Sequence, residues 1–418
     1  QIVAQIPTSA LSDETPINIH NIIKEPPIHL LEKWEWTEEE LPAITQNKIF
    51  SLKDQQKYSF SEIILKLLSN PSIASKSWVY RQYDSQVQSN TVFKPGDADA
   101  ALIRLRRQDE KNKNKEFAGV AASVDCNSRW VLLDPYRGSI AAVAESARNV
   151  SCVGAQPIAI TNNLNFSSPE TEIGYWQLSS ACDGISKACI ALETPVTGGN
   201  VSLYNESKNQ NNQVTPINPT PVIGMVGTIK NVDKAISSGW KNINDQIWII
   251  GSNASESSIA ASSYLEYFHD LVTGRPPKIH LQDEKHCQSF LRDSIQKNYI
   301  ASSHDVSDGG LAIALSECCI LSSKGAYIRL EEKNARQDNL LFSEGGSRII
   351  FSVNKKEEQN FLNFLEIKSK DFGKNVYVKK IGFVSEHNLD ITLQDQTLCN
   401  LRVDELTEKF NNSISNCF

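Results

Sequence analysis

Two polar segments, each following an apolar run, carry residues suited to binding a nucleotide. In residues 197–202 (TGGNVS), adjacent glycines let the backbone approach a ligand and turn N–H groups toward phosphate oxygens, while Asn and Ser add side-chain contacts. In residues 160–166 (ITNNLNF), three Asn side chains follow a predicted strand, where ligands gather in α/β sheets, and offer oxygens to a nucleotide or a metal. A tight turn and an Asx-turn loop are the alternative interpretations.

Three further segments place carboxylates or glycines beside predicted strands. Asp125 and Asp134 follow two neighbouring apolar runs and would suit Mg²⁺ bound to a triphosphate, although Asp before Pro is also a common turn former. Residues 303–310 (SHDVSDGG) bring one His and two Asp to a strand-to-helix turn, where capping of the helix by Asp308 is the alternative explanation. Residues 342–348 (FSEGGSR) predict another glycine turn. None of these segments identifies an enzyme by itself.

The elements that must position these segments alternate between strand and helix patterns. Residues 1–6 and 101–106 predict strands, and a charged loop follows at 106–116. Helical spacing recurs at 55–69, at 139–155 and at 175–192, and the alternation continues through residues 245–393. This order favours a mixed α/β or α+β architecture over a helical bundle.

Length and composition bound the class of protein. A chain of 418 residues is long enough for two or three domains, and a net charge of −7 argues against broad nucleic-acid binding. No apolar run approaches the roughly 18 to 20 residues that span a bilayer, and the nine Cys lack a zinc-type or disulfide pattern. We expect a cytoplasmic protein with reduced core thiols. Because the chain starts at Gln1, we also expect it to be a segment of a longer protein.

The order of the polar segments resembles the synthetase (PurL) subunits of phosphoribosylformylglycinamidine synthase. The stretches SARNVSCVGAQPIAITNNLNF and TPVTGGNVSLYNE carry this resemblance in the first half, and HDVSDGGLAIAL and FSEGGSRIIFSV carry it in the second. It extends from Gln1 to about residue 395. It implies an internally duplicated chain built from a unit shared with aminoimidazole ribonucleotide (AIR) synthetase, in which a ferredoxin-like A-type domain precedes a B-type α/β domain.

The resemblance also implies domain boundaries. The expected parts are the end of a preceding B-type domain at 1–18, a linker with a helical segment at 19–91, an A-type domain at 92–232, a B-type domain at 240–395 and a C-terminal tail at 396–418. The first A-type domain of the family, which holds its catalytic histidines, would lie outside this chain. The resemblance therefore predicts no catalytic residue here and predicts that the chain alone is inactive.

The activity implied by the resemblance is an ATP-dependent ligase of purine biosynthesis. ATP activates the amide oxygen of formylglycinamide ribonucleotide, and ammonia from a glutaminase displaces phosphate to give the amidine. The implied partners are the PurQ glutaminase and PurS, with Mg²⁺ bound beside ATP, and no nucleic acid or membrane is expected. A nucleotide-holding scaffold without catalysis and another ATP-using member of the AIR synthetase superfamily are the alternatives.

Four residues match the family's binding motif position by position. The resemblance assigns Asn162 and Gly199 to ATP, Asn200 to the metal and Ser202 to the ribonucleotide substrate. Many members of the family have Asp at the position of Asn162. The segment Glu344-Gly345-Gly346 departs from the Glu-Ser-Gln that binds substrate in the first half of the family, which suggests a second, degenerate site.

Overall fold

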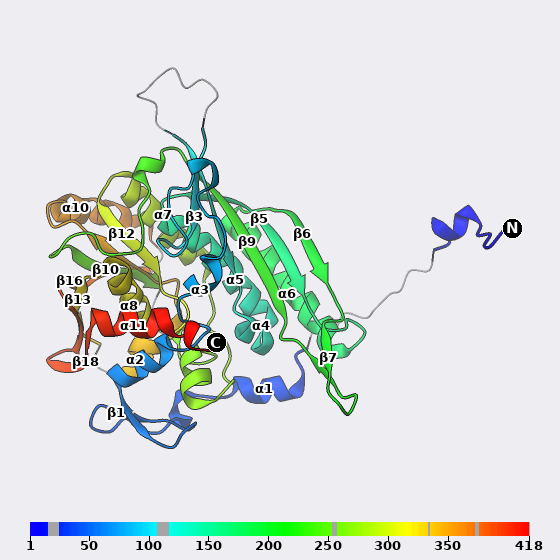
Figure 1. The fold of residues 1–418 in the computed structure, drawn as a ribbon, viewed down its shortest axis with the longest axis horizontal. Coiled ribbons are helices and arrows are strands. Elements are labelled where there is room, and N and C mark those ends of the chain that lie inside the picture. The colour runs from blue at the N-terminus through cyan, green and yellow to red at the C-terminus, as the bar shows by residue number, and fades with distance from the viewer. Residues whose placement is uncertain (16–24, 107–116, 253–256, 333–334, 373–375, 418) are drawn as a thin grey trace.

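Two mixed sheets organise the chain (Figure 1). The structure, a computed structural model, describes residues 1–15, 25–106, 117–252, 257–332, 335–372 and 376–417. The charged loop predicted at 106–116 falls almost entirely outside these residues. Within them, no helix combines the length and the apolar character needed to cross a bilayer.

The first sheet has five strands in the order β3-β4-β9-β5-β6. Its strands are β3 (Ala101–Arg104), β4 (Gly119–Asp125), β5 (Gln156–Asn165), β6 (Val196–Ser202) and β9 (Thr220–Ile229), and the hairpin β7 (Glu206–Lys208)–β8 (Val214–Pro216) follows β6. All neighbours pair antiparallel except β5 and β6, which are parallel. Strand β6 therefore forms one edge of the sheet.

One face of this sheet is covered by helices. Helices α4 (Ser128–Leu133), α5 (Pro135–Cys152) and α6 (Glu172–Leu192) contribute to a core that includes Val150 and Ile185, together with Ile160 and Met225 of the sheet. Helix α5 begins where it does because Asp134 caps it, accepting a hydrogen bond from the backbone N–H of Arg137 at 2.9 Å. The small residues predicted to form a buried helix do so.

The opposite face of the five-stranded sheet is open within the described residues. In β4 the side chains alternate, so that Ala121 is buried while Val124 is 71% exposed. Ile103 of β3, on the same face as Val124, is 50% exposed. The sheet thus has one packed side and one accessible side.

The second sheet has seven strands in the order β12-β15-β10-β16-β13-β17-β18. They are β10 (Gln246–Ser252), β12 (Ile300–Asp305), β13 (Gly325–Leu330), β15 (Ile349–Val353), β16 (Val376–Ser385), β17 (Asn388–Leu393) and β18 (Gln396–Arg402). The accompanying elements are the π-helical turn Leu265–His269, α7 (Leu281–Gln296), α8 (Gly310–Ser322), α9 (Gln337–Phe342) and α10 (Glu358–Lys368), with β11 (Ser257–Ser258) paired to β14 (Glu344–Gly345). The predicted alternation of strands and helices is confirmed.

Segments from both ends of the chain pack on the second sheet. Before the first sheet come α1 (Ile28–Trp34), β1 (Lys48–Phe50), β2 (Lys57–Ser59), α2 (Phe60–Leu68) and α3 (Ser77–Tyr80). The helix predicted at 55–69 is shorter, because the side chains and backbones of Ser59 and Glu62 form a capping box that starts α2 at Phe60. Ile63 and Leu67 of α2 lie in the core of the second sheet.

Residues 396–412 of the stretch 396–418, which was expected as a tail, form regular structure instead. Strand β18 extends the second sheet, and α11 (Val403–Asn412) follows it. The reason is that Leu398, Leu401 and Leu406 are buried in the same core as α2.

The strand predicted at residues 1–6 is absent. Residues 1–7 have no regular structure, and a single 3₁₀ turn follows at Thr8–Leu11. Ile2 and Val3 are 81% and 93% exposed, since none of the described strands pairs with them. A segment with an alternating apolar pattern forms a stable strand only when a neighbouring strand pairs with it.

Candidate functional site at the edge of the five-stranded sheet

The four predicted site residues lie on two adjacent strands. In the parallel ladder between β5 and β6, Asn162 is opposite Gly199, Asn163 is opposite Asn200, and Asn165 is opposite Ser202. Segments separated in the sequence by α6 are therefore brought together at the edge of the sheet. Asn200 is exposed and Ser202 is half-buried.

The two segments are strands rather than the turn and the loop considered from sequence. Strand β5 continues through Asn165 because it pairs with β9 on one side and β6 on the other. Neither Gly198 nor Gly199 has a positive φ, so no tight turn requires them. A side chain at Gly199 would place its Cβ 1.9 Å from Oδ1 of Asn162, whereas a Cβ at Gly198 would meet open space. Close approach of Asn162, and not backbone conformation, explains the glycine at 199.

The four site residues lie on both faces of the sheet at its edge. Asn162 shares a face with Ile160, and its cross-strand neighbour Ile223 is buried in the core beneath the helices. Asn200 is on the opposite, open face, where its Nδ2 donates to Oδ1 of Asn163 at 3.0 Å. Asn162 and Gly199 therefore face the helix layer, while Asn200 and Ser202 face away from it.

The edge offers neutral oxygen ligands rather than a complete metal site. Among the residues that the structure describes, no group of three His, Cys, Asp or Glu side chains is arranged to hold a metal ion. The hydrogen bond to Asn163 uses the Nδ2 of Asn200 as donor and does not involve the Oδ1 of Asn200. An amide oxygen is an acceptable Mg²⁺ ligand. Because Mg²⁺ takes several oxygen ligands, Asn200 would supply only one of them. The remaining ligands would come from the nucleotide, water or another domain.

A second polar cluster lies at the junction of the two sheets and forms buried ion pairs within the protein, although Oδ2 of Asp305 has no hydrogen-bond partner among the described residues. Arg148 of α5, only 4% exposed, contacts Asp305 of β12 and lies 2.7 Å from Glu284 of α7. Burial alone would lower the pKa of Arg148, but the two carboxylates raise it well above its ordinary value. Burial raises the pKa of Asp305 to about 6, while Arg148 opposes that shift. This pair was not predicted from the sequence; its signal is Arg148 among the small apolar residues in the second half of α5.

His304 and Asp99 extend the junction cluster. Nδ1 of His304 lies 2.6 Å from Oδ1 of Asp99, and its Nε2 lies 3.1 Å from Glu317. Burial acts to lower the pKa of His304, but Asp99 raises it well above the ordinary value. His304 of β12 is thereby held between Asp99, which precedes β3, and Glu317 of α8.

Arg129 forms a comparable contact on the other side of the junction. It pairs with Glu266 at 2.6 Å and with Glu344 at 3.3 Å. Glu344 also accepts hydrogen bonds from the backbone N–H groups of Ser263 and Gly309, at 2.7 and 2.9 Å. The predicted glycine turn at 342–348 therefore carries a structural anchor.

The capping predictions had mixed outcomes. The alternative explanation of Asp134 as a turn residue is confirmed, because it caps α5 and pairs with Arg275 at 2.8 Å. The prediction that Asp308 caps α8 is wrong, because Gly309 occupies the N-cap position and Asp308 instead accepts a hydrogen bond from Asn127 at 2.9 Å.

Two family profiles match the two sheets. The AIR synthase related protein N-terminal domain matches residues 97–229, and the corresponding C-terminal domain matches residues 242–382. The chain therefore belongs to the AIR synthase related proteins, and the predicted fold class is confirmed.

Within that family, the predicted resemblance to PurL subunits is confirmed over the whole chain. The chain is 98% identical over 418 residues to phosphoribosylformylglycinamidine synthase subunit PurL of Prochlorococcus marinus subsp. pastoris, and it covers 54% of that protein. A PurL of another Prochlorococcus marinus strain is 49% identical over 424 residues, with 99% of this chain and 53% of the relative covered. The chain thus spans about half the length of the curated relatives it matches.

Solved structures of a distant PurL share the fold. Thermotoga maritima PurL complexed with FGAR superposes with a TM-score of 0.63 at 16% identity, covering 84% of this chain and 54% of that one. The same protein complexed with ADP gives a TM-score of 0.62 at 16% identity, covering 82% and 51%. At this identity the likeness establishes the arrangement of elements and not the ligands of this chain.

Proposed function

We propose that this chain is part of a phosphoribosylformylglycinamidine synthase and contributes one side of its ATP site. The observation that carries the proposal is the meeting of four motif residues at one sheet edge, in a chain 98% identical to a PurL subunit. The reaction joins ammonia to formylglycinamide ribonucleotide with release of ADP and phosphate. Solved relatives described as complexed with ATP, ADP and FGAR support this chemistry.

The proposed roles of the four residues are those that the resemblance to PurL subunits implies. Asn162 and Gly199 contact ATP from the helix side of the edge, while Asn200 contributes its oxygen to Mg²⁺ on the open side. Ser202, two residues along the same face, meets the ribonucleotide substrate. Bound Mg²⁺ supplies charge neutralisation during phosphoryl transfer, and the protein groups mainly position the reactants.

The rest of the active site comes from another part of the protein. The edge residues are neutral, and the resemblance to PurL subunits places the groups that move protons in the half of PurL outside this chain. The open sheet face beside Asn200, with Val124 71% exposed, is where that half would pack. PurQ and PurS are the proposed partners, as the PurLQS assembly of Thermotoga maritima suggests, and the proposed location is the cytoplasm.

We also propose 92–232 and 240–395 as the two domains of this chain. The profile matches at 97–229 and 242–382 lie inside these ranges. Strand β18 and helix α11 extend the second domain beyond residue 395 because they share its core.

The proposal is tested by Asn200→Ala in the complete protein, assayed for amidine formation with ammonia as the nitrogen donor. Loss of one metal ligand should lower kcat/KM for Mg-ATP by roughly tenfold or more and raise the Mg²⁺ concentration needed for half-maximal rate. Asn211→Ala, in the exposed β7–β8 hairpin, is the matched control and should leave both unchanged.

Two outcomes would contradict the proposal. Unchanged kinetics in a folded Asn200→Ala protein would remove the metal role. Amidine formation by this chain alone, without the other half of the protein, would show that the site is complete here. Nucleotide binding without any contribution to turnover would favour the scaffold alternative.

A further inference from the structure

The side chain of Asn205 folds back onto the end of strand β6, just before the chain enters the β7–β8 hairpin (Figure 1). Its Oδ1 accepts a hydrogen bond from Oγ of Ser202 at 3.2 Å. Its Nδ2 donates to the backbone carbonyl of Ser202 at 2.8 Å. One amide side chain therefore binds both the hydroxyl and the carbonyl of Ser202.

Asn205 also holds the end of strand β5. Its Nδ2 and its backbone N–H both donate to the carbonyl of Phe166, each at 3.1 Å. Phe166 is fully buried directly after β5, and its own N–H donates to the carbonyl of Ser202 at 3.0 Å. The carbonyl of Asn205 accepts from the N–H of Ile217, which follows β8, at 3.1 Å. Asn205 thus ties the ends of two strands to the base of the hairpin.

These contacts fix the orientation of the Asn205 amide. Its Nδ2 group has two hydrogens, and both are used by backbone carbonyls. The reverse orientation would place the amide oxygen against two carbonyl oxygens. The amide therefore presents its oxygen to Ser202, and the Ser202 side chain, which would otherwise choose among three staggered rotamers, has one preferred partner.

The backbone at Tyr204 makes this return possible. Tyr204 has a φ of 60°, in the left-handed region that is uncommon for residues other than glycine. Its N–H donates to the carbonyl of Ser167 at 3.4 Å, and its hydroxyl donates to Oε1 of Glu170 at 3.2 Å. Strained backbone persists where surrounding contacts enforce it, and it is concentrated at functional sites. The turn at Tyr204 brings Asn205 back over Ser202.

We propose that Asn205 is a positioning residue for the ribonucleotide substrate, acting by fixing the hydroxyl of Ser202 at the end of β6. This inference rests on the proposed function, in which Ser202 contacts that substrate. Both polar atoms of the Asn205 side chain are already bonded to protein groups, so its action on the ligand is indirect. Its effect should fall on the ribonucleotide and not on ATP, because Asn162 and Gly199 lie farther from this end of the two strands.

The first test is Asn205→Ala in the complete protein, assayed with ammonia as the nitrogen donor. We expect KM for the ribonucleotide to rise roughly tenfold while KM for ATP changes by less than about twofold, because only the Ser202 hydroxyl loses its position. Asn209→Ala is the matched control. The side chain of Asn209 also makes three hydrogen bonds, to Asn211 and Gln213 within the same hairpin, and its loss should change neither KM.

A double substitution separates positioning from direct contact. Ser202→Ala alone should raise KM for the ribonucleotide roughly tenfold, and adding Asn205→Ala should change it by less than about twofold, since no hydroxyl is left to position. Effects that multiply would show that Asn205 acts independently of Ser202 and would overturn the inference. An equal rise of both KM values in Asn205→Ala, or an equal effect of Asn209→Ala, would overturn it as well.

The outcomes distinguish this inference from the proposed function. If Ser202→Ala raises KM for the ribonucleotide and Asn205→Ala does not, only the inference fails. If Ser202→Ala leaves that KM unchanged in an active protein, the proposed substrate contact of Ser202 fails and the inference fails with it.

Discussion

The edge of the five-stranded sheet and the junction between the two sheets both gather polar side chains, with opposite consequences. At the junction, Arg148 and Asp305 are ionisable, buried and paired with each other. At the edge, Asn162 and Asn200 are neutral, accessible and only lightly bonded. Buried charges must be matched by other protein groups, whereas accessible amides can exchange water for a ligand. The junction cluster is richer in titratable residues, and its ion pairs hold the two sheets together, whereas the binding role that we propose belongs to the neutral residues of the edge.

The largest effect should come from removing a buried charge at the junction between the two sheets. Arg148→Met leaves Glu284 and Asp305 buried without their partner, and we expect it to lower the free energy of unfolding by about 3–5 kcal/mol, measured by urea denaturation. Arg402→Met is the control, because Arg402 and Asp404 form an exposed pair and its loss should change stability by no more than about 0.5 kcal/mol. Equal effects of the two substitutions would show that the junction charges are not structural.

The glycine pair at the edge offers the next largest effect. Gly199→Ala in the complete protein should raise KM for ATP by roughly tenfold, because the new methyl group collides with Asn162, while unfolding changes little at this exposed strand. Gly198→Ala should leave KM nearly unchanged, because its Cβ would meet open space. A similar KM for the two variants would contradict the proposed contact of ATP with the edge strand at Gly199.

The smallest effect concerns pH. Burial raises the pKa of Asp125 at the end of β4 from 3.8 to about 6. The folded state therefore holds this proton where the unfolded chain has lost it, so the contribution of Asp125 to stability is present below pH 4 and is lost as pH rises through about 6. Asp125→Asn, which cannot titrate, should show a smaller loss of stability between pH 4.5 and 7.5 in urea titrations. An identical loss in both proteins would contradict the shift.

The sequence patterns predicted most of the helices and strands but not the segments against which they pack. Apolar periodicity predicted α5 and α6, because the burial of one face is recorded in residue spacing. The same pattern failed at residues 1–6, where pairing partners decide the outcome, and at 396–402, where an apparent tail completes a sheet. Strand pairing depends on segments far away in the chain and leaves no local signal.

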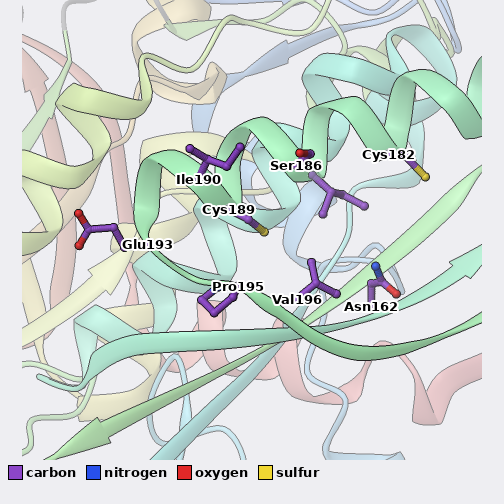
Figure 2. A pocket seen from close by; sticks show the side chains of 9 residues that line it. Asn162, Cys182, Ser186, Cys189, Ile190, Glu193, Pro195 and Val196 are labelled. Carbon is purple, nitrogen blue, oxygen red and sulfur yellow. The ribbon is translucent and has the colours of Figure 1, made fainter.

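The candidate site shows the same division. The types of residue at 199–202 and at Asn162 indicated a ligand, and their meeting on adjacent strands agrees with that prediction. Predicting which face of the sheet each of these residues occupies requires the register between β5 and β6. No spacing rule in the sequence supplies that register. The pocket between α6 and the edge strands, beside Asn162 (Figure 2), was also not predicted, because Cys182 and Ser186 have the spacing of ordinary helix residues.

The docking of α2 against the last helix has a consequence for biosynthesis. The backbone N–H of Ser75 donates to the carbonyl of Phe410, and the hydroxyl of Ser413 donates to the carbonyl of Ser69, 344 residues earlier in the sequence. During translation α2 leaves the ribosome long before β18 and α11 exist, so its apolar side must wait, covered by other segments or by a chaperone, until they are made. Completion of this domain therefore depends on residues 396–412, and a ribosome stalled before residue 396 would display a sheet that lacks its outer strand.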